Sequence, residues 1–296
     1  MVVSNFSNNK TFRGIIDLSV LNDKRPSFHQ QILSNNQLAV GEVCSLSANY
    51  TEPMQSSGPL PFAIDLSAEI PRFRAETFWS KEPETLEWIN RNLGNKSNVD
   101  LFIDVGANIG IYSLYASVVN QEVSIISIEP FSANFLELEK NISLNNKQNQ
   151  IVALEVALSS RSGRGNLRIT DDRLGSSGSQ IEVTDDSSSA QTIVETGDRL
   201  VDSKSDLLSQ FGRKVMLKID TDGNELDVLL GFSESFGKGI IGTVLVETHP
   251  SNRHEIESYL NSVGLQEDLT YLEIGGHSNY RRAEKGNTER TKIYNN

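Results

Sequence analysis

The chain has 296 residues, of which 37% are hydrophobic, with a formal net charge of −12 and a single cysteine, Cys44. This length allows one large domain with additions or two small ones. The acidic balance and dispersed Lys and Arg residues argue against a nucleic-acid substrate, and no apolar run approaches the roughly 18 residues of a membrane span. Because a lone cysteine forms no internal disulfide and the N-terminus lacks a signal-peptide pattern, we expect a cytoplasmic protein.

The first part of the chain has weak periodicity and is rich in Asn, Ser and Gln, and prolines and glycines interrupt its end. We interpret residues 1–74 as an irregular extension of unclear role, with short strands or one helix around residues 28–33. We assign residues 75–296 to one domain, because a clear alternation of helical and strand patterns begins there.

The spacing of apolar residues predicts a helix that begins at Pro83, with acids in its first turn. It then predicts strands over 99–104, 123–128 and 151–158, with helices over 111–118 and 131–145 between them. Further along it predicts strands over 214–220 and 241–247, with a helix over 223–230 between them that ends at Gly231. A helix capped by Ser251 and ending at Gly264 follows, and then a final strand pair, 265–274 and 291–294. This order is typical of a mostly parallel sheet with helices on both faces.

The stretch from Ser159 to Arg213 breaks this alternation and is interpreted as an insertion. Residues 167–169 and 191–195 look like a pair of strands. Residues 171–189, between them, are rich in Asp, Gly and Ser, which predicts an exposed loop. This loop is either a mobile segment over the site or a disordered one.

The most informative motif follows the strand at 99–104 and reads Asp104-Val-Gly106-Ala107-Asn108-Ile-Gly110. An acid, then glycines, then a helix is how an α/β domain builds a nucleoside pocket at the carboxyl ends of its strands. The next strand ends at Glu129-Pro130, and Glu129 lies 19 residues beyond Gly110, where a carboxylate can accept from both ribose hydroxyls. A dinucleotide site prefers G-x-G-x-x-G, but Asn108 occupies the middle position. The wider turn fits S-adenosylmethionine (SAM), which has a ribose but no phosphate.

Charged residues cluster where the strands at 214–220 and 241–247 end. Asp220 is the first choice for a general base or for a group that orients an acceptor hydroxyl. Lys218 alternates with Asp220, so the two can share one face, where the cation holds Asp220 ionised or contacts the substrate. Glu247 and His249 flank the next strand tip, and His249 is an alternative base near neutral pH.

Asp222 and Glu225, in the loop and helix that follow, are assigned to an acidic substrate-binding rim. Each of these acids also has a purely structural interpretation, as a cap of a turn or of a helix. Asp220 and Glu247 can imitate two hard oxygen ligands of Mg²⁺. No third ligand and no Cys/His cluster is evident, so we predict no metal site.

Four blocks in this order resemble the FkbM-like class I SAM-dependent methyltransferases: Lys81–Ile89, Asp104–Ser113, Glu129-Pro130 and Lys218–Glu225. The resemblance covers about residues 75–296. It implies a seven-stranded Rossmann-like sheet, SAM as cofactor, and methyl transfer to a hydroxyl of a natural product, sugar or glycan. It also implies a cofactor-binding set made of Asp104, Gly106, Ala107, Asn108 and Gly110 at the methionine and ribose, Glu129 and Pro130 at the ribose, and Ala157 and Leu158 at the adenine. Ser160 stands where the family often has an acid.

The sequence therefore favours a SAM-dependent O-methyltransferase that acts on a small molecule or a carbohydrate. A methyltransferase acting on nitrogen and a non-catalytic binding protein that kept the pocket are the alternatives. A nicotinamide oxidoreductase on a related fold is disfavoured by Asn108.

Overall fold

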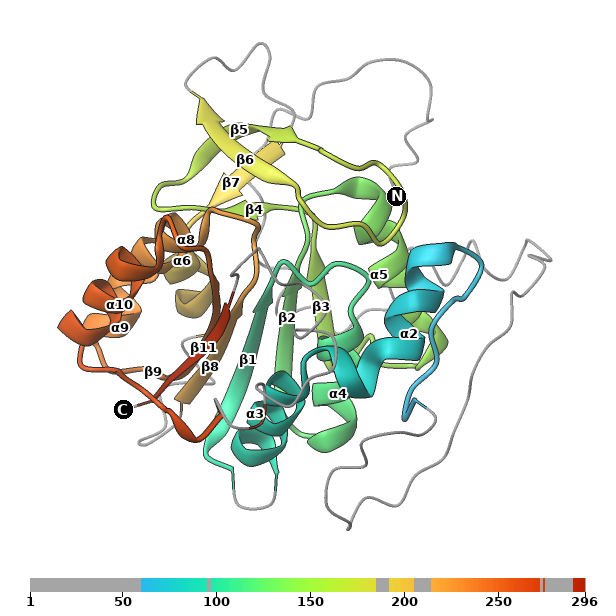
Figure 1. Ribbon diagram of the computed structural model, residues 1–296, viewed down its shortest axis with the longest axis horizontal. Coiled ribbons are helices and arrows are strands. Elements are labelled where there is room, and N and C mark those ends of the chain that lie inside the picture. The colour runs from blue at the N-terminus through green and yellow to red at the C-terminus, as the bar shows by residue number, and fades with distance from the viewer. Residues whose placement is uncertain are drawn as a thin grey trace.

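The computed structural model describes residues 60–94, 97–184, 192–204, 214–271, 274 and 290–295. A seven-stranded sheet with the order β3-β2-β1-β8-β9-β11-β10 forms its centre (Figure 1). Its strands are β1 (Val99–Val105), β2 (Ser124–Ile128), β3 (Ile151–Leu154), β8 (Lys214–Ile219), β9 (Ile241–Thr248), β10 (Gln266–Glu267) and β11 (Arg290–Asn295). Only β11 runs antiparallel to its neighbours. The predicted mostly parallel α/β sheet is confirmed.

Helices cover both faces of this sheet because its central strands are apolar on both sides. One layer contains α2 (Glu69–Lys81), α3 (Pro83–Leu93), α4 (Ile111–Val119) and α5 (Ser132–Leu144). The other contains α6 (Gly197–Asp202), α8 (Glu225–Leu230), α9 (Ser233–Gly237) and α10 (Arg253–Ser262). On β1, Phe102 packs into the first layer, whereas Leu101 and Ile103 pack into the second.

The chain builds β1, β2 and β3 outward on one side, then returns to place β8 on the other side of β1. Connections from β1 and β8 therefore leave in opposite directions, which opens a crevice at the carboxyl ends of these two strands. Glycine turns and strand-end acids from both strands meet there, as the sequence predicts.

A second, four-stranded sheet with the order β4-β7-β5-β6 lies beyond the carboxyl ends of the main strands (Figure 1). It contains β4 (Ala157–Leu158), β5 (Gly163–Arg168), β6 (Gln180–Thr184) and β7 (Thr192–Glu195). The predicted single strand over 151–158 is wrong, because the main-sheet strand ends at Leu154 and Ala157-Leu158 pairs with β7. The strand pair predicted from residues 167–169 and 191–195 is correct only in part. β5 and β7 do pair, through residues 163–165 and 192–194, but Leu167 and Arg168 pair with β6 instead.

The predicted exposed loop over 171–189 is wrong in part, because residues 180–184 form β6 and pair with β5. Residues 185–191 lie outside the described part of the chain. Two predictions near the C-terminus are also corrected. The N-cap of α10 is Asn252 rather than Ser251. Among the described residues of the strand predicted over 265–274, only Gln266–Glu267 form a strand, since the Asp268 side chain accepts from the backbone and hydroxyl of Thr270 and starts a turn. Residues 272–273 lie outside the described part of the chain.

Residues 60–74, which the sequence analysis places in the extension, pack against the folded domain. Leu60, Phe62 and Ile64 are buried in the core that lies under α2 and α3. The side chain of Asn145 on α5 accepts from the backbone N–H of Ala63 and donates to its carbonyl. The helix predicted around residues 28–33 lies outside the described residues. Within the described ranges, no helix combines the length and apolar character that crossing a membrane requires.

Candidate cofactor and acceptor site

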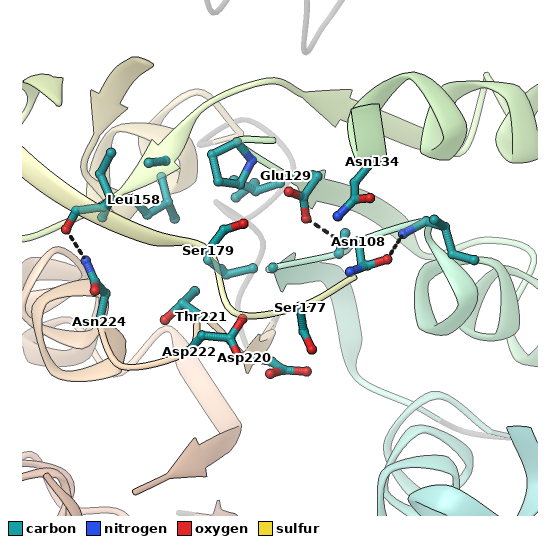
Figure 2. Close-up of a pocket in the computed structure, with 18 of the residues that line it drawn as sticks. Asn108, Glu129, Asn134, Leu158, Ser177, Ser179, Asp220, Thr221, Asp222 and Asn224 are labelled. Carbon is teal, nitrogen blue, oxygen red and sulfur yellow. Dashed lines mark hydrogen bonds between the residues drawn. The ribbon is translucent and has the colours of Figure 1, made fainter. Parts of the chain in front are cut away.

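A pocket of about 820 Å³, including its open mouth, lies at the carboxyl ends of β1, β2 and β8 (Figure 2). This volume suits a nucleoside-sized ligand. Ten residues that the sequence predicts for the site line it: Gly106, Ala107, Asn108, Glu129, Pro130, Ala157, Leu158, Lys218, Asp220 and Asp222. Five others predicted for the site are not part of this lining: Asp104, Gly110, Glu225, Glu247 and His249.

The turn between β1 and α4 requires glycine at two positions for different reasons. Gly106 has φ +78°, and a Cβ there would lie 1.8 Å from the carbonyl oxygen of Asp220, so this turn packs directly on the tip of β8. Gly110 has φ +87°, and a Cβ there would lie 2.4 Å from Leu138. Gly110 therefore lets α4 approach α5, and it does not face the pocket.

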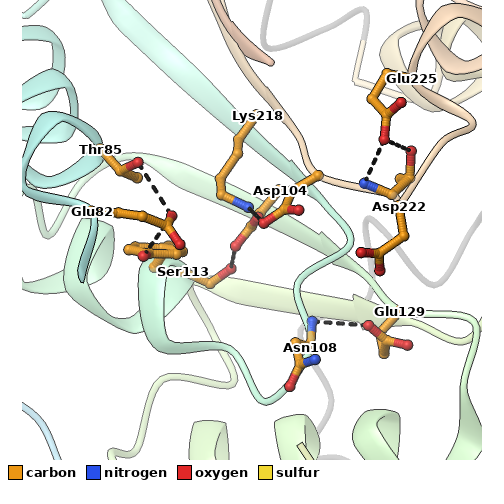
Figure 3. A network of polar contacts seen from close by, with 12 residues as sticks. Glu82, Thr85, Asp104, Asn108, Ser113, Glu129, Lys218, Asp222 and Glu225 are labelled. Carbon is orange, nitrogen blue, oxygen red and sulfur yellow. Dashed lines mark hydrogen bonds and ion pairs between the residues drawn. The ribbon is translucent and has the colours of Figure 1, made fainter. Parts of the chain in front are cut away.

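Glu129 is 5% exposed and accepts one backbone hydrogen bond on each carboxylate oxygen. Asn108 N–H donates to Oε2 at 2.9 Å (Figures 2 and 3). Phe131 N–H donates to Oε1 at 2.9 Å. A carboxylate can accept about four hydrogen bonds. One acceptor position thus remains on each oxygen, which matches the two neighbouring hydroxyls of a ribose.

Burial raises the pKa of Glu129 to about 7, even though the two backbone hydrogen bonds oppose this shift. The carboxyl is therefore protonated below pH 7, and in that form it cannot accept from two hydroxyls as well as from both backbone amides. We expect the affinity for S-adenosylhomocysteine (SAH) to fall by up to about tenfold for each pH unit below 7. Calorimetric titrations between pH 8 and pH 5.5 measure this dependence.

Glu129→Gln is the matched control, because the amide does not titrate, so its pH profile should be flat. If the variant and the native protein show the same slope, the pH dependence belongs to another group and the assignment of Glu129 is wrong.

The wall beyond Glu129 is apolar and is built from both sheets. Ile128, Val156, Ala157 and Leu158 line one side, and Leu167 on β5 and Ile181 on β6 belong to the same lining. Such a slot suits a purine ring. Ser160, the position that departs from the family pattern, points elsewhere, since its hydroxyl donates to Asp227 at 3.2 Å.

Residues 175–181, here called the strap, cross the pocket (Figure 2). On one side, the amides of Asn108 and Asn134 donate to the carbonyl of Ser176 at 2.7 and 3.1 Å. On the other side, Gly178 N–H donates to Asp222 at 2.6 Å and the amide of Asn224 donates to Ile181 O at 2.8 Å. The strap thus ties the glycine turn to the loop after β8.

Sequence reasoning missed several lining residues, among them Asn134, Ser176, Ser177, Ser179 and Asn224. One signal was present, because Asn134 is an amide on the buried face of α5, beside Leu138 and Ile142. Buried amides of this kind are usually hydrogen-bonded, and this one holds Gly175 and Ser176 of the strap.

A buried ion pair formed by Lys218 lies behind the part of the pocket wall that contains Asp220 (Figure 3). Lys218 is 1% exposed, and its Nζ lies 3.1 Å from Asp220 Oδ2 and 3.5 Å from Asp104 Oδ1. Strand register explains this, since Asp104 and Lys218 are direct partners in the β1–β8 pairing. Asp104 also accepts from Ser113 at 2.7 Å. Asp104 is fully buried, whereas the Asp220 side chain is 31% exposed, so only Asp220 reaches the pocket.

The two ends of this pair hold opposite charges at neutral pH. Burial alone would lower the pKa of Lys218, but the carboxylates of Asp220, Asp104 and Glu82 outweigh it and raise that pKa above its ordinary value. Burial likewise favours neutral Asp220, but Lys218 and a hydrogen bond with the Glu247 side chain hold the pKa of Asp220 well below its usual range. Asp220 is thus ionised at the pocket wall at neutral pH.

Glu225 does not complete an acidic rim, contrary to the sequence-based expectation. It is fully buried, and it accepts from Gly223 N–H at 2.8 Å and from the Asn252 amide at 2.8 Å, which fixes the loop after β8 to α10. Glu247 lies next to the site through its contact with Asp220. His249 is not brought to the pocket, and its backbone N–H donates to Asn252 at 2.9 Å.

The donor set at the strand tips does not resemble a metal centre. In the part of the chain that the structure describes, no group of three or more His, Cys, Asp and Glu side chains could hold a metal ion. Lys218 already places a cation 3.1 Å from Asp220, which opposes a divalent ion at the same carboxylate.

The sheet order, with its single antiparallel strand, and the glycine turn on β1 are those of a class I SAM-dependent methyltransferase. Residues 104–272 match the family model described as the methyltransferase FkbM domain, and the chain belongs to this family. The predicted family, the methyltransferase activity and the cofactor SAM are thereby confirmed, and the nicotinamide alternative is excluded.

Two curated relatives and one solved structure are similar to this chain. Methyltransferase sdnD of Sordaria araneosa is 27% identical over an alignment of 205 residues, which covers 60% of this chain and 78% of sdnD. Hexuronic acid methyltransferase AglP of Haloferax volcanii is 26% identical over 174 residues, 58% of this chain and 66% of AglP. The solved FkbM methyltransferase of Methylobacillus flagellatus KT has 16% identity and a TM-score of 0.47, over 77% of this chain and 52% of that one.

Proposed function

We propose that this methyltransferase moves the methyl group of SAM to an oxygen of a small hydroxylated molecule or a carbohydrate. The observation that carries the proposal is Asp220, an anion held by Lys218 at the wall of the cofactor pocket. An oxygen acceptor carries a proton that must leave, and a carboxylate beside the reacting atoms can both orient the O–H group and take that proton.

The residues present fit SAM. Glu129 offers two acceptor positions for the ribose, and the apolar slot that contains Ala157 and Leu158 offers a place for the adenine. Asn108, at φ 52°, widens the turn where a dinucleotide site has a glycine. When bound, SAM supplies a methyl carbon on a positively charged sulfur, which is a good leaving group.

Asp220 accepts the hydrogen bond of the acceptor O–H and so aims the oxygen lone pair at the methyl carbon. SAM held by Glu129 and the apolar slot would supply the methyl carbon, whose bond to sulfur would break as the O–C bond forms, with the electron pair left on sulfur. The alkylated oxygen is then strongly acidic, so its proton passes to Asp220 even though the pKa of Asp220 lies far below its usual range. Lys218 keeps Asp220 ionised until that moment.

The acceptor side of the pocket supports a hydroxylated acceptor. Ser177, Ser179, Thr221 and Asp222 gather near Asp220 (Figure 2) and offer hydroxyl and carboxylate groups for further hydrogen bonds. The relative named hexuronic acid methyltransferase acts on a sugar acid, according to its name, which agrees with a carbohydrate acceptor. Asp222 is the best candidate for a second substrate contact.

Transfer of tritiated methyl from SAM to a fractionated host extract, followed by mass spectrometry of the labelled product, tests this proposal. We expect a methylated oxygen, with the label stable to mild alkali if the acceptor is a hydroxyl and released as methanol if it is a carboxylate. A labelled nitrogen would support the N-methyl alternative. SAH binding without transfer to any fraction would support a non-catalytic protein, and activity lost in EDTA and restored by Mg²⁺ would contradict the metal-free mechanism.

A further inference from the structure

Arg74 lines the pocket although it belongs to none of the sequence motifs. It lies on α2, half-buried, and its Nε donates to the carbonyl of Gly175 in the strap at 2.9 Å. Among the described residues, no carboxylate forms an ion pair with this guanidinium. A positive charge thus faces a nucleoside-sized cavity without a counter-ion.

The pocket lining contains three acidic side chains, Glu129, Asp220 and Asp222, and two basic ones, Lys218 and Arg74. Lys218 is already neutralised by two carboxylates and is 1% exposed, so it cannot serve a ligand as a free cation. Of the described lining residues, Arg74 is therefore the cation available to an anionic group of the ligand.

The direction in which SAM lies follows from the sheet order. The apolar slot with Ala157 and Leu158 follows β3, Glu129 follows β2, and Gly106 follows β1. With adenine in the slot and ribose at Glu129, the amino-acid end of SAM extends toward β1 and the start of α4. Arg74 lines the same pocket as Glu129 and Tyr112. Burial raises the pKa values of Glu129 and Tyr112, and the positive charge of Arg74 opposes both shifts.

The start of α4 provides a second source of positive potential. Ile111 and Tyr112, the first two residues of this nine-residue helix, line the pocket. No side chain caps the helix, so its first backbone N–H groups are not used by a capping residue. An N-terminus of this kind favours a negative group nearby.

We propose that Arg74 binds the α-carboxylate at the amino-acid end of SAM. SAM carries one anionic group, and the guanidinium of Arg74 with the N-terminus of α4 forms the matching cationic corner. The inference rests on the proposed placement of SAM and is independent of the acceptor. Arg74 also donates a hydrogen bond to the carbonyl of Gly175, so the same side chain binds the carboxylate and holds the strap in position.

Arg74→Gln should weaken SAH binding about ten- to hundredfold, the effect of losing a charge-assisted hydrogen bond. The variant should bind 5′-methylthioadenosine, which has the adenine and ribose but no carboxylate, as tightly as the native protein does. Arg74→Lys should recover part of the SAH affinity, because it keeps the charge without the forked geometry. Calorimetry of the native protein and both variants with each ligand measures these affinities.

Arg173→Gln is the matched control, since Arg173 is 65% exposed, pairs with Asp171 and does not line the pocket. Equal weakening of SAH and 5′-methylthioadenosine by Arg74→Gln would mean that Arg74 only positions the strap, which overturns the proposal. Unchanged SAH affinity with a raised KM for the acceptor would move the contact to the acceptor and overturn it too. Failure of the native protein to bind SAH would instead refute the cofactor placement itself.

Discussion

Replacing Asp220 with Asn should lower kcat by about 10² to 10⁴ while SAH binds with nearly unchanged affinity. The amide keeps the shape of the side chain but cannot take the acceptor proton, and this range is typical for the loss of a general base. Single-turnover transfer of labelled methyl measures the rate, and calorimetry measures the affinity.

Asp202→Asn is the control for this experiment, because the Asp202 side chain is 63% exposed and does not line the pocket. Activity of Asp220→Asn equal to that of the native enzyme would remove Asp220 from the mechanism. Loss of SAH affinity together with activity would mean that Asp220 serves the cofactor instead of the acceptor.

Replacing Lys218 with Met should lower the free energy of unfolding by about 3–5 kcal/mol at pH 7. The variant leaves Asp104 buried and Asp220 partly buried without their shared cation, and breaking a buried pair from one side has this cost. Urea denaturation measures the change. Lys238→Met is the control, because Lys238 is 51% exposed and its loss removes only surface ion pairs.

The destabilisation of Lys218→Met should shrink as the pH falls from 7 toward 4. In the native protein the folded-state pKa of Asp220 lies below its unfolded value, so its stabilising contribution is still present at pH 4 and is lost only at lower pH, as the pH falls through the folded-state pKa. The change between pH 7 and pH 4 therefore comes from the variant. Without the Lys218 cation, these carboxyl groups bind protons at higher pH, and protonation lowers the free-energy cost of burying them. A pH-independent difference would show that Lys218 stabilises the fold by packing alone.

The glycine turn and Glu129 could be predicted because their signals are local. Gly106 and Glu129 each end an apolar strand, and the ends of neighbouring parallel strands meet at one edge of a sheet. The order of the strands followed from the alternation with helices. These features depend on residues that are close in the sequence.

The orientation of the acids could not be predicted in the same way. Asp104 and Asp220 both stand at strand ends, but the pairing of Asp104 with Lys218 turns it toward α4, where Ser113 donates to it. Glu225 is held by Asn252, which comes from another helix. A single sequence does not say which carboxylate faces a cavity and which faces a distant partner.

Strand β6, which continues from the strap, has a strand-like sequence pattern that the residues before it obscure. Residues 180–184 read Gln-Ile-Glu-Val-Thr, an alternation of polar and apolar residues that is typical of a strand, but a stretch rich in Ser and Gly precedes it. Arg74 gave no local signal at all. Its partner, Gly175, is 101 residues away, so only the fold brings them together.

A crystal structure of the protein with SAH bound would show directly whether Glu129 holds the ribose. We expect both ribose hydroxyls to donate to the carboxylate of Glu129, with the sulfur on the side of the pocket that faces Asp220. A ribose bound away from Glu129, or a sulfur turned away from Asp220, would contradict this expectation.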